Sequence, residues 1–380
     1  MKRLKALCLS VVLSSIISYS FLSFYTKGSA DLTVKNNSIR YNVSYEKYNS
    51  HDVLVNNINK NTILLLGSSE LTVGNDFEEH PRQFLDFSDK NIMQIGGGYY
   101  QSLMHSIILG SIGNEVPNKT VNFILSMQWF DKEGANPNAF QPRFSLDHLN
   151  NLYRNEKLSK ETKEKIYNRI LELSSNNEIT KTTISRMKRD NYFDKILNKL
   201  YYRKYKFICN NNFLKEYKRD NSVNNKKFSK DIDWENLKNK AIERGKLETT
   251  NNKYFLENKY FNHFIKNKFK KLKSSDKNIT FGESPEYKDL QLFLDVAKEL
   301  GFKVNLFLVP LQGYWADYTE VPKSEIEKYY VKIRKIAKDN NVNLIDYSEY
   351  SYIPYFFKDI THLGRLGLLK LQEDLLKYND

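Results

Sequence analysis

The stretch TILLLGSSEL, residues 62–71, decides the fold of this 380-residue chain. Its short apolar run ends at Gly67, a pattern typical of a strand buried on both faces of a parallel sheet. Ser69 follows directly and is expected to open a helix at the carboxyl end of that strand, where open α/β sheets bind their ligands. A serine there is suited to attack a carbonyl, because its own N–H can meet the developing oxyanion. A serine is also a favoured helix N-cap, so both interpretations of Ser69 stand.

Strand patterns alternate with helical patterns along much of the chain. Four further apolar segments are expected to be strands: residues 92–95, 121–126, 304–309 and 343–345. Ser284, Pro285 and Glu286 supply a cap, a first-turn proline and a first-turn acid for a helix that ends near Gly301. Pro322 opens another helix. This alternation predicts βαβ units and an α/β fold whose parallel sheet is covered by helices on both faces.

The N-terminus has the pattern of a membrane segment. Lys2, Arg3 and Lys5 precede residues 6–24, which carry no charge and are nearly as long as the ~20 residues that cross a bilayer. A signal anchor and a cleaved signal peptide are the two interpretations, and the length favours the anchor. The basic cluster predicts a cytoplasmic N-terminus and an extracytoplasmic remainder. We therefore expect an anchor over residues 1–30, a polar tether over 31–60 and a catalytic domain over 61–380.

The middle of the chain is strongly basic. Residues 151–280 hold 33 Lys and Arg against 16 Asp and Glu, whereas the formal charge of the whole chain is +14. Amphipathic patterns over residues 159–173 and 184–207, without a convincing buried strand, predict a helical insertion in this segment. A basic face attracts polyanions such as nucleic acid, anionic lipid or a phosphate polymer. A solvated helical surface is the alternative.

Cysteine and histidine patterns offer no metal or disulfide chemistry. Cys8 lies inside the apolar N-terminal run, so it is not expected to pair with Cys209. The histidines are scattered, with no H-x-x-x-H pair and no cysteine cluster that would predict a zinc site. We therefore expect no metal in this protein.

The C-terminus carries a second candidate for chemistry. Asp359-Ile-Thr-His362 precedes the last helical pattern, residues 364–378. At this spacing on a turn, Asp359 can accept a hydrogen bond from one ring nitrogen of His362 and leave the other nitrogen facing a nucleophile. A surface turn or a helix cap is the alternative for an isolated Asp-x-x-His.

The order of these features resembles the GDSL/SGNH hydrolases. In that family an early serine, a backbone glycine, a side-chain amide and a late Asp-x-x-His form the site. The resemblance implies a three-layer α/β/α fold and a triad of Ser69, Asp359 and His362. It also implies an oxyanion hole from the block Gly96, Gly97 and Gly98, among which Gly97 and Gly98 are our candidates, and from Gln128, which stands where asparagine is customary.

The finer resemblance is to the DltD family of teichoic acid D-alanyl transfer proteins. It rests on the single N-terminal membrane segment, the GSSEL block, Asp76 with His80-Pro81, the block IGGGYYQSLMH at residues 95–105, the Gln128-Trp-Phe block and the Asp359-Ile-Thr-His362-Leu-Gly block. Met127 departs from the proline expected there. The resemblance implies D-alanyl transfer through Ser69 to a teichoic or lipoteichoic acid polymer, without a metal or nucleotide cofactor. The implied partners are a D-alanyl donor, with a carrier protein as one candidate, and a membrane acyltransferase.

Other functions remain open for the same residues. The triad also suits an extracytoplasmic esterase, a thioesterase or a glycan O-acetyltransferase, and a docking module that binds a carrier protein and a membrane acyltransferase needs no triad at all. An extracytoplasmic location argues against nucleic acid as the partner of the basic segment. Tyr314 and Trp315 follow the strand that ends near residue 309, so they are candidates for lining the substrate cleft, with ordinary loop packing as the alternative.

Overall fold

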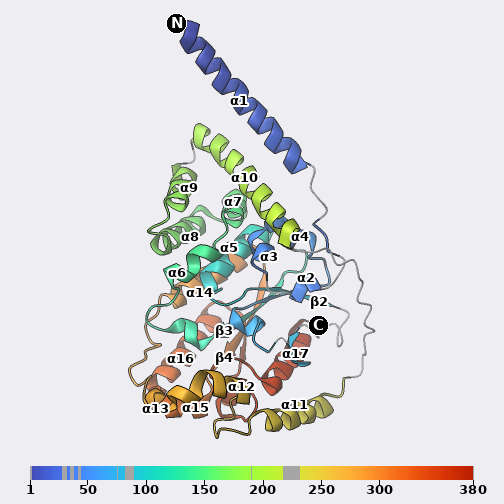
Figure 1. Cartoon of the computed structure of the whole chain (residues 1–380), viewed down its shortest axis with the longest axis vertical. Coiled ribbons are helices and arrows are strands. Elements are labelled where there is room, and N and C mark those ends of the chain that lie inside the picture. Colours follow the sequence, from blue (N-terminus) through green and yellow to red (C-terminus); the bar gives the residue numbers. More distant parts are fainter. Residues whose placement is uncertain are drawn as a thin grey trace.

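Figure 1 shows a computed structural model of the chain, in which a helical body surrounds a central sheet and one long helix projects from it. The structure describes residues 2–27, 32–34, 38–41, 44–74, 76–81, 90–189, 191–216 and 232–379.

The central sheet has five strands in the order β2-β1-β3-β4-β5, and every neighbouring pair is parallel. The strands are β1 (Thr62–Leu66), β2 (Asn91–Ile95), β3 (Thr120–Ser126), β4 (Lys303–Val309) and β5 (Asn343–Asp346). All five predicted strands are confirmed, with bounds that differ by at most one residue.

β1 lies inside the sheet between β2 and β3, and its side chains alternate between two apolar cores. Ile63 and Leu65 belong to one core, and Leu64 and Leu66 belong to the other. All four side chains are at most 2% exposed, because helices cover both faces of the sheet. This double burial is the reason that the strand reads as one continuous apolar run.

Helices form the two outer layers. The core that contains Leu64 is closed mainly by α5 (Ser102–Ile112), α7 (Leu146–Arg154), α14 (Glu286–Glu299) and α16 (Lys323–Asp339). The opposite core is closed by α17 (Arg365–Asn379), through Leu368, Leu371 and Leu375. The predicted three-layer α/β/α fold is confirmed.

The helix signals place boundaries well, with one exception. The Ser284 hydroxyl accepts the Glu286 N–H at 3.2 Å ahead of α14, and Pro322 directly precedes α16. Ser159 caps α8 (Lys160–Leu173) through the Thr162 N–H. The pattern over residues 184–207 is not one helix, because it is divided between α9 (Glu178–Arg189) and α10 (Tyr192–Glu216).

The N-terminal part holds one membrane-length helix and three short ones. Within α1 (Lys2–Lys27), residues Lys2–Phe21 are long and apolar enough to cross a membrane. Residues 44–60 differ from the expected tether, since α3 (Tyr45–Asn49) and α4 (His51–Asn56) bury Tyr48 and Leu54 in the main core. The third short helix is α2 (Ser38–Tyr41). The remaining residues between 28 and 43 lie outside the described residues, apart from 32–34.

The basic segment does not form one surface. α8, α9 and α10 lie at the end of the body nearest α1 (Figure 1). α11 (Trp234–Glu248), α12 (Asn258–Tyr260) and α13 (Phe269–Leu272) lie at the opposite end, beside α15 (Gly313–Thr319) and the start of α17. α6 (Pro137–Phe140) is a single turn. The basic side chains of this segment therefore lie at two separate ends of the protein.

Two backbones meet closely at the carboxyl ends of β1 and β2. Gly96 has φ +131°, and a Cβ at that position would lie 1.8 Å from the Gly67 carbonyl oxygen. Gly67 in turn donates its N–H to the Ile95 carbonyl at 3.3 Å. Only glycine permits both this backbone conformation and this approach.

Replacing Gly96 by alanine is expected to lower the free energy of unfolding by roughly 3 kcal/mol or more. Left-handed backbone strain of about 1–3 kcal/mol adds to the clash with Gly67. Denaturant unfolding of the detergent-solubilised chain measures the effect. Gly98→Ala is the matched control: a Cβ there meets nothing within 4 Å, so its stability should change by less than about 1 kcal/mol. Equal stability of the two variants would contradict the assignment of Gly96.

Candidate active site

Ser69 lies two residues beyond β1, at the carboxyl edge of the sheet. It opens a 3₁₀ turn of only three residues, Ser69–Leu71, and not the longer helix that was expected. The Ser69 carbonyl accepts the N–H groups of Thr72 and Val73 at 3.0 and 2.9 Å. These bonds hold the turn, so local hydrogen bonding, and not a longer helix, positions the serine.

The structure brings the three predicted triad residues together. His362 Nε2 lies 2.8 Å from Ser69 Oγ, and His362 Nδ1 lies 2.9 and 2.8 Å from the two oxygens of Asp359. Asp359 also accepts the backbone N–H groups of Thr361 and His362 at 2.9 and 2.8 Å. The imidazole is therefore oriented with Nδ1 toward the carboxylate and Nε2 toward the hydroxyl, the arrangement that proton transfer from a serine requires.

The electrostatics of the pair follow from this geometry. Burial acts to lower the pKa of His362, but the hydrogen bond and charge of Asp359, with the charge of Glu70, outweigh burial and raise it above 6.5. Burial acts to raise the pKa of Asp359, yet its hydrogen bonds to His362 and Thr361 and the charge of His362 lower it on balance. Asp359 thus stays ionised while His362 gains or loses a proton.

Glu70 is the first-turn acid of the same turn, and it is buried. Its side chain is 4% exposed, and its Oε2 accepts the Ser68 N–H at 2.9 Å. The second oxygen is buried without a hydrogen-bond partner among the described residues. Glu70 therefore braces the turn that carries the serine and adds negative charge near His362.

His105 supports the same turn from α5. Its Nε2 lies 2.9 Å from the Gly67 carbonyl oxygen. Burial lowers the pKa of His105 to about 4, so the ring is neutral at physiological pH and its Nε2–H donates to Gly67. The sequence block that contains His105 signalled the site, but not this positioning role.

The glycine block lies beside the nucleophile turn. The Gly97 carbonyl accepts the Ser68 hydroxyl at 3.2 Å, and Gly98 is partly exposed with open space beside its Cα. No acceptor within the described residues takes the N–H of Ser69, Gly97 or Gly98. Ser69 and Gly98 are partly exposed, whereas Gly97 is buried.

Gln128 lies on the 3₁₀ turn Met127–Phe130, directly after β3. Its side chain is the exposed one of that turn, whereas Met127 and Trp129 are 1% and 4% exposed and pack in the main core. β3 neighbours β1, so Gln128 and Ser69 share the same edge of the sheet. Among the described residues, no hydrogen bond joins Gln128 to the triad.

Tyr314 and Trp315 belong to an apolar cluster that also contains Tyr260 and Ile265 of the cleft wall described next. Trp315 is 5% exposed in a core with Tyr254 and Leu256. The Tyr314 hydroxyl donates to the Tyr352 carbonyl at 2.9 Å. The structure thus shows Trp315 in a packing role, and neither side chain lines the cleft described next.

An open cleft of about 1000 Å³ borders Asp359 and His362. Its far wall is formed by α12 and the π-helical turn Phe261–Ile265, which present Lys259, His263 and Phe264. Phe264 is 51% exposed at this wall. Sequence reasoning grouped these residues with the basic insertion and missed them; the interleaved basic and aromatic residues over 259–264 were the available signal.

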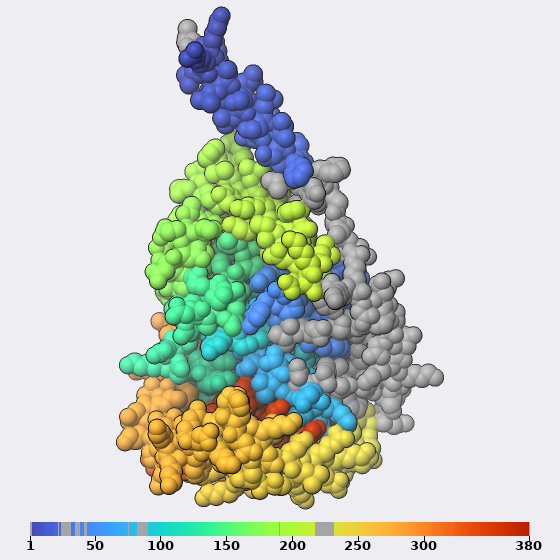
Figure 2. All heavy atoms as spheres, viewed as in Figure 1, coloured from blue at the N-terminus to red at the C-terminus, as the bar shows by residue number. Residues whose placement is uncertain are grey.

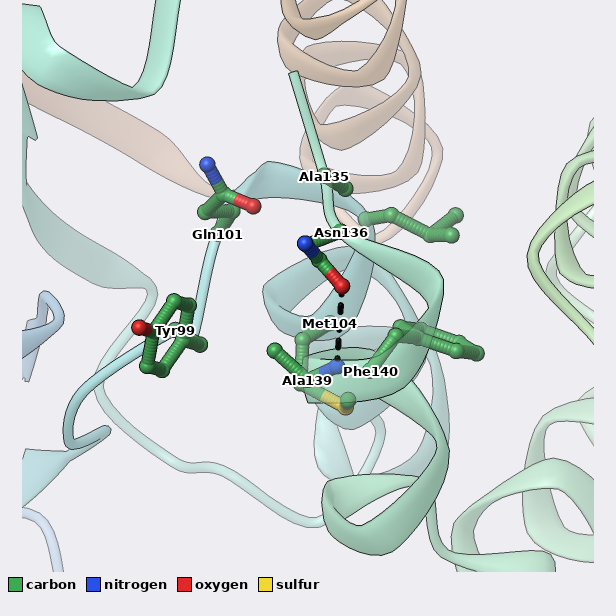
Figure 3. Close-up of a pocket in the computed structure, with 8 residues that line it drawn as sticks. Tyr99, Gln101, Met104, Ala135, Asn136, Ala139 and Phe140 are labelled. Carbon is green, nitrogen blue, oxygen red and sulfur yellow. Dashed lines mark hydrogen bonds between the residues drawn. The ribbon is translucent and has the colours of Figure 1, made fainter. Parts of the chain in front are cut away.

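A much smaller pocket lies beyond the glycine block. Figure 3 shows it between Tyr99, Gln101 and Phe140, with Asn136 capping the turn at Ala139. Its volume of about 10 Å³ is that of one water-sized probe. A substrate therefore has room beside His362 and not here.

A three-layer α/β fold with Ser69, His362 and Asp359 in contact at the carboxyl edge of its sheet is typical of the SGNH-like class. The model of the DltD protein family matches residues 38–380, and the chain belongs to that family. It is 29% identical over 321 residues to Protein DltD of Bacillus subtilis (strain 168), covering 80% of this chain and 78% of the relative.

Two further relatives are similar over most of their length. Protein DltD of Staphylococcus aureus (strain NCTC 8325 / PS 47) is 27% identical over 324 residues, which cover 83% of this chain and 80% of the relative. Protein DltD of Lacticaseibacillus rhamnosus is 25% identical over 342 residues, covering 83% and 76%.

Labelling of Ser69 by a fluorophosphonate is expected to speed up as pH rises through a midpoint above 6.5. The reaction needs His362 neutral, and its pKa is raised. Asp359→Asn removes the charge that raises the pKa of His362, so the midpoint should fall. The plateau rate of labelling should also drop, by about 10³-fold or more. Asp339→Asn, on the exposed end of α16, is the control. An unchanged midpoint in Asp359→Asn would refute the coupling.

Glu70→Gln is expected to move the same midpoint downward, because it removes a negative charge that raises the pKa of His362. The amide oxygen of glutamine can still accept the Ser68 N–H, so the turn should persist. The midpoint of the labelling rate measures the shift, and Glu349→Gln, an exposed carboxylate, serves as control. A lower rate with an unmoved midpoint would mean that Glu70 acts only as a brace.

Proposed function

We propose that the chain transfers D-alanyl groups to teichoic or lipoteichoic acid through an acyl-enzyme on Ser69. The observation that carries this proposal is the 2.8 Å contact between His362 Nε2 and Ser69 Oγ, with Asp359 on the opposite ring nitrogen. Membership of the DltD family supports a role in the D-alanylation of teichoic acid.

In the first half-reaction Ser69 Oγ attacks the carbonyl carbon of the D-alanyl donor. His362 Nε2 takes the hydroxyl proton as the C–O bond forms, and Asp359 stabilises the resulting imidazolium. The bond from the carbonyl carbon to the donor then breaks, and the leaving thiol or alcohol departs with the proton from His362. The product is a D-alanyl ester of Ser69.

In the second half-reaction a polymer hydroxyl attacks that ester. His362 takes the proton of the hydroxyl and returns it to Ser69 Oγ when the ester bond breaks. Each tetrahedral intermediate places a negative charge on the carbonyl oxygen. The free N–H groups of Ser69, Gly97 and Gly98 are the donors proposed to stabilise it, together with the exposed amide of Gln128.

The cleft beside the triad suits a polyanionic acceptor. Its basic residues are Lys259, His263 and Lys358. Asp76 and Glu257 also line it and neutralise Lys358 at 3.9 and 3.4 Å, so Lys259 supplies the positive charge of the wall. Positive charge at an open cleft raises the local concentration of a phosphate polymer, an attraction that salt screens. We assign the acceptor role to the teichoic acid polymer, the donor role to a D-alanyl carrier, with a carrier protein as one candidate, and a partner role to a membrane acyltransferase.

Ser69→Ala and His362→Ala are each expected to abolish esterified D-alanine on teichoic acid in cells, measured by its release at alkaline pH. Both remove a group of the proton relay, whereas the exposed Ser175→Ala on the α8–α9 connection leaves it intact and should retain the wild-type level.

Wild-type D-alanylation by a folded Ser69→Ala variant would overturn the mechanism and favour a docking module without catalysis. The two variants could lose activity while the purified wild-type chain prefers acetyl donors over D-alanyl donors. That outcome would instead favour an esterase or an O-acetyltransferase.

A further inference from the structure

The outward face of α10 is apolar. Tyr192, Phe193 and Ile196 are 82%, 66% and 43% exposed, and Leu200 is partly exposed. Ile196 and Leu200 follow Tyr192 and Phe193 at spacings of three, four, seven and eight residues, so the four side chains share one side of the helix. We call these four side chains the α10 apolar face. A surface helix ordinarily turns such residues toward the core, so this face requires a partner.

The side of α10 that faces the protein is polar. Asp194 and Asn198 are both 3% exposed. Arg189 donates two hydrogen bonds to Asp194, at 2.9 and 3.0 Å, and Arg186 donates to Asn198 at 3.3 Å. Over residues 192–200 the polarity of the helix is therefore inverted: the hydrogen-bonding side chains Asp194 and Asn198 face inward and the apolar ones face outward. Farther along, Phe213 of the same helix is buried in an apolar cluster in the ordinary way.

The same helix contacts α1 near the end of the membrane-length segment. The Arg203 guanidinium lies 4.4 Å from the centre of the Tyr19 ring, and Arg203 also donates to the Ser23 hydroxyl. The apolar segment of α1 runs to Phe21. Figure 2 shows α1 leaving the body beside the surface of α9 and α10. The α10 apolar face thus continues the apolar surface of α1.

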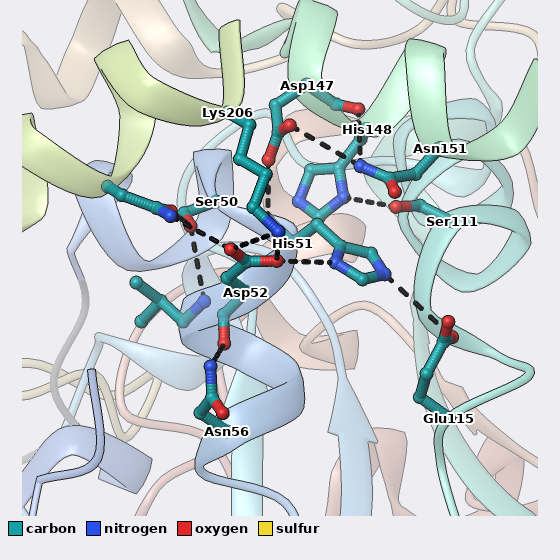
Figure 4. Close-up of polar contacts among 12 residues, drawn as sticks. Ser50, His51, Asp52, Asn56, Ser111, Glu115, Asp147, His148, Asn151 and Lys206 are labelled. Carbon is teal, nitrogen blue, oxygen red and sulfur yellow. Dashed lines mark hydrogen bonds and ion pairs between the residues drawn. The ribbon is translucent and has the colours of Figure 1, made fainter. Parts of the chain in front are cut away.

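A buried polar network fixes α10 to the catalytic domain. Lys206 lies 2.8 Å from Asp52, and Asn210 donates to Asp52 at 2.9 Å. Figure 4 shows His51 between Asp52 and Glu115. Burial acts to lower the pKa of His51, but these two carboxylates raise it to about 9, so the network is charged at neutral pH. The direction of the α10 apolar face is set by the fold.

We propose that the α10 apolar face lies in the headgroup region of the lipid bilayer that α1 enters, and forms a second membrane contact of this protein. Tyrosine and phenylalanine at this depth bury their rings against acyl chains. Basic side chains flank the face and meet anionic headgroups: Lys195, Lys199 and Lys204. Continuity with α1 favours lipid over a soluble partner.

The test places an environment-sensitive fluorophore on the face. The full chain with Cys8→Ser and Cys209→Ser receives Ile196→Cys, labelled with nitrobenzoxadiazole, in nanodiscs that contain phosphatidylglycerol. Lipids with a nitroxide near the headgroup should quench this label several-fold more than a label at Leu247→Cys, which is 75% exposed on α11 at the opposite end of the body. Phe193→Cys repeats the measurement at an independent position.

Equal access of aqueous iodide to the labels at 196 and 247, without quenching by nitroxide lipid, would overturn the proposal. Protection of position 196 that occurs in native membranes but not in nanodiscs would overturn it as well, because the face would then bind a protein. Unchanged thermal unfolding of the labelled variants establishes that each readout comes from folded protein.

Discussion

The close approach of Gly96 to the Gly67 carbonyl is the constraint on which the nucleophile depends. Gly67 directly follows β1, and its carbonyl also accepts from His105, so this peptide group contacts both the glycine block and α5. Ser68 is tied in turn to Gly97 and to Glu70. The residues on either side of Ser69 are therefore held by hydrogen bonds, although the turn itself is only three residues long.

The histidine reaches the serine from the far end of the chain, 293 residues later. Its support is separate: Asp359 accepts two backbone N–H groups of its own loop, and Arg365 follows with ion pairs to Glu79 and Glu248. α17 then packs on the face of the central sheet that contains Ile63 and Leu65. Ser69 and the pair His362 and Asp359 are thus both positioned by the same rigid sheet. The sheet keeps Ser69 and His362 at hydrogen-bond distance although they come from distant segments.

Local patterns predicted the features that local forces determine. Short apolar runs marked all five strands, and glycine follows directly after β1 and β2. Strands that are buried on both faces leave this pattern in the sequence. The order of the short blocks pointed to the three residues that meet. Other features depend on contacts between distant segments, which a periodic pattern of apolar residues does not reveal. They are the burial of Glu70, the folding of residues 44–60 and the cleft wall at Phe264. The inverted polarity at the start of α10 was not predicted either, because an apolar stripe on a helix is ordinarily expected to face the core.

The placement of the cleft constrains its substrate. α1 and α10 occupy one end of the body, and α12, α13 and the start of α17 occupy the other (Figure 1). If the α10 apolar face lies in the bilayer, the open side of the triad cleft is held away from the lipid surface. The cleft wall that carries Lys259 and His263 would then lie at the end of the body away from α1, where a chain that extends outward from the membrane would meet it. Under the two proposals together, the basic side chains of α10 would meet anionic lipid and Lys259 would meet an extended polyanion beside the nucleophile.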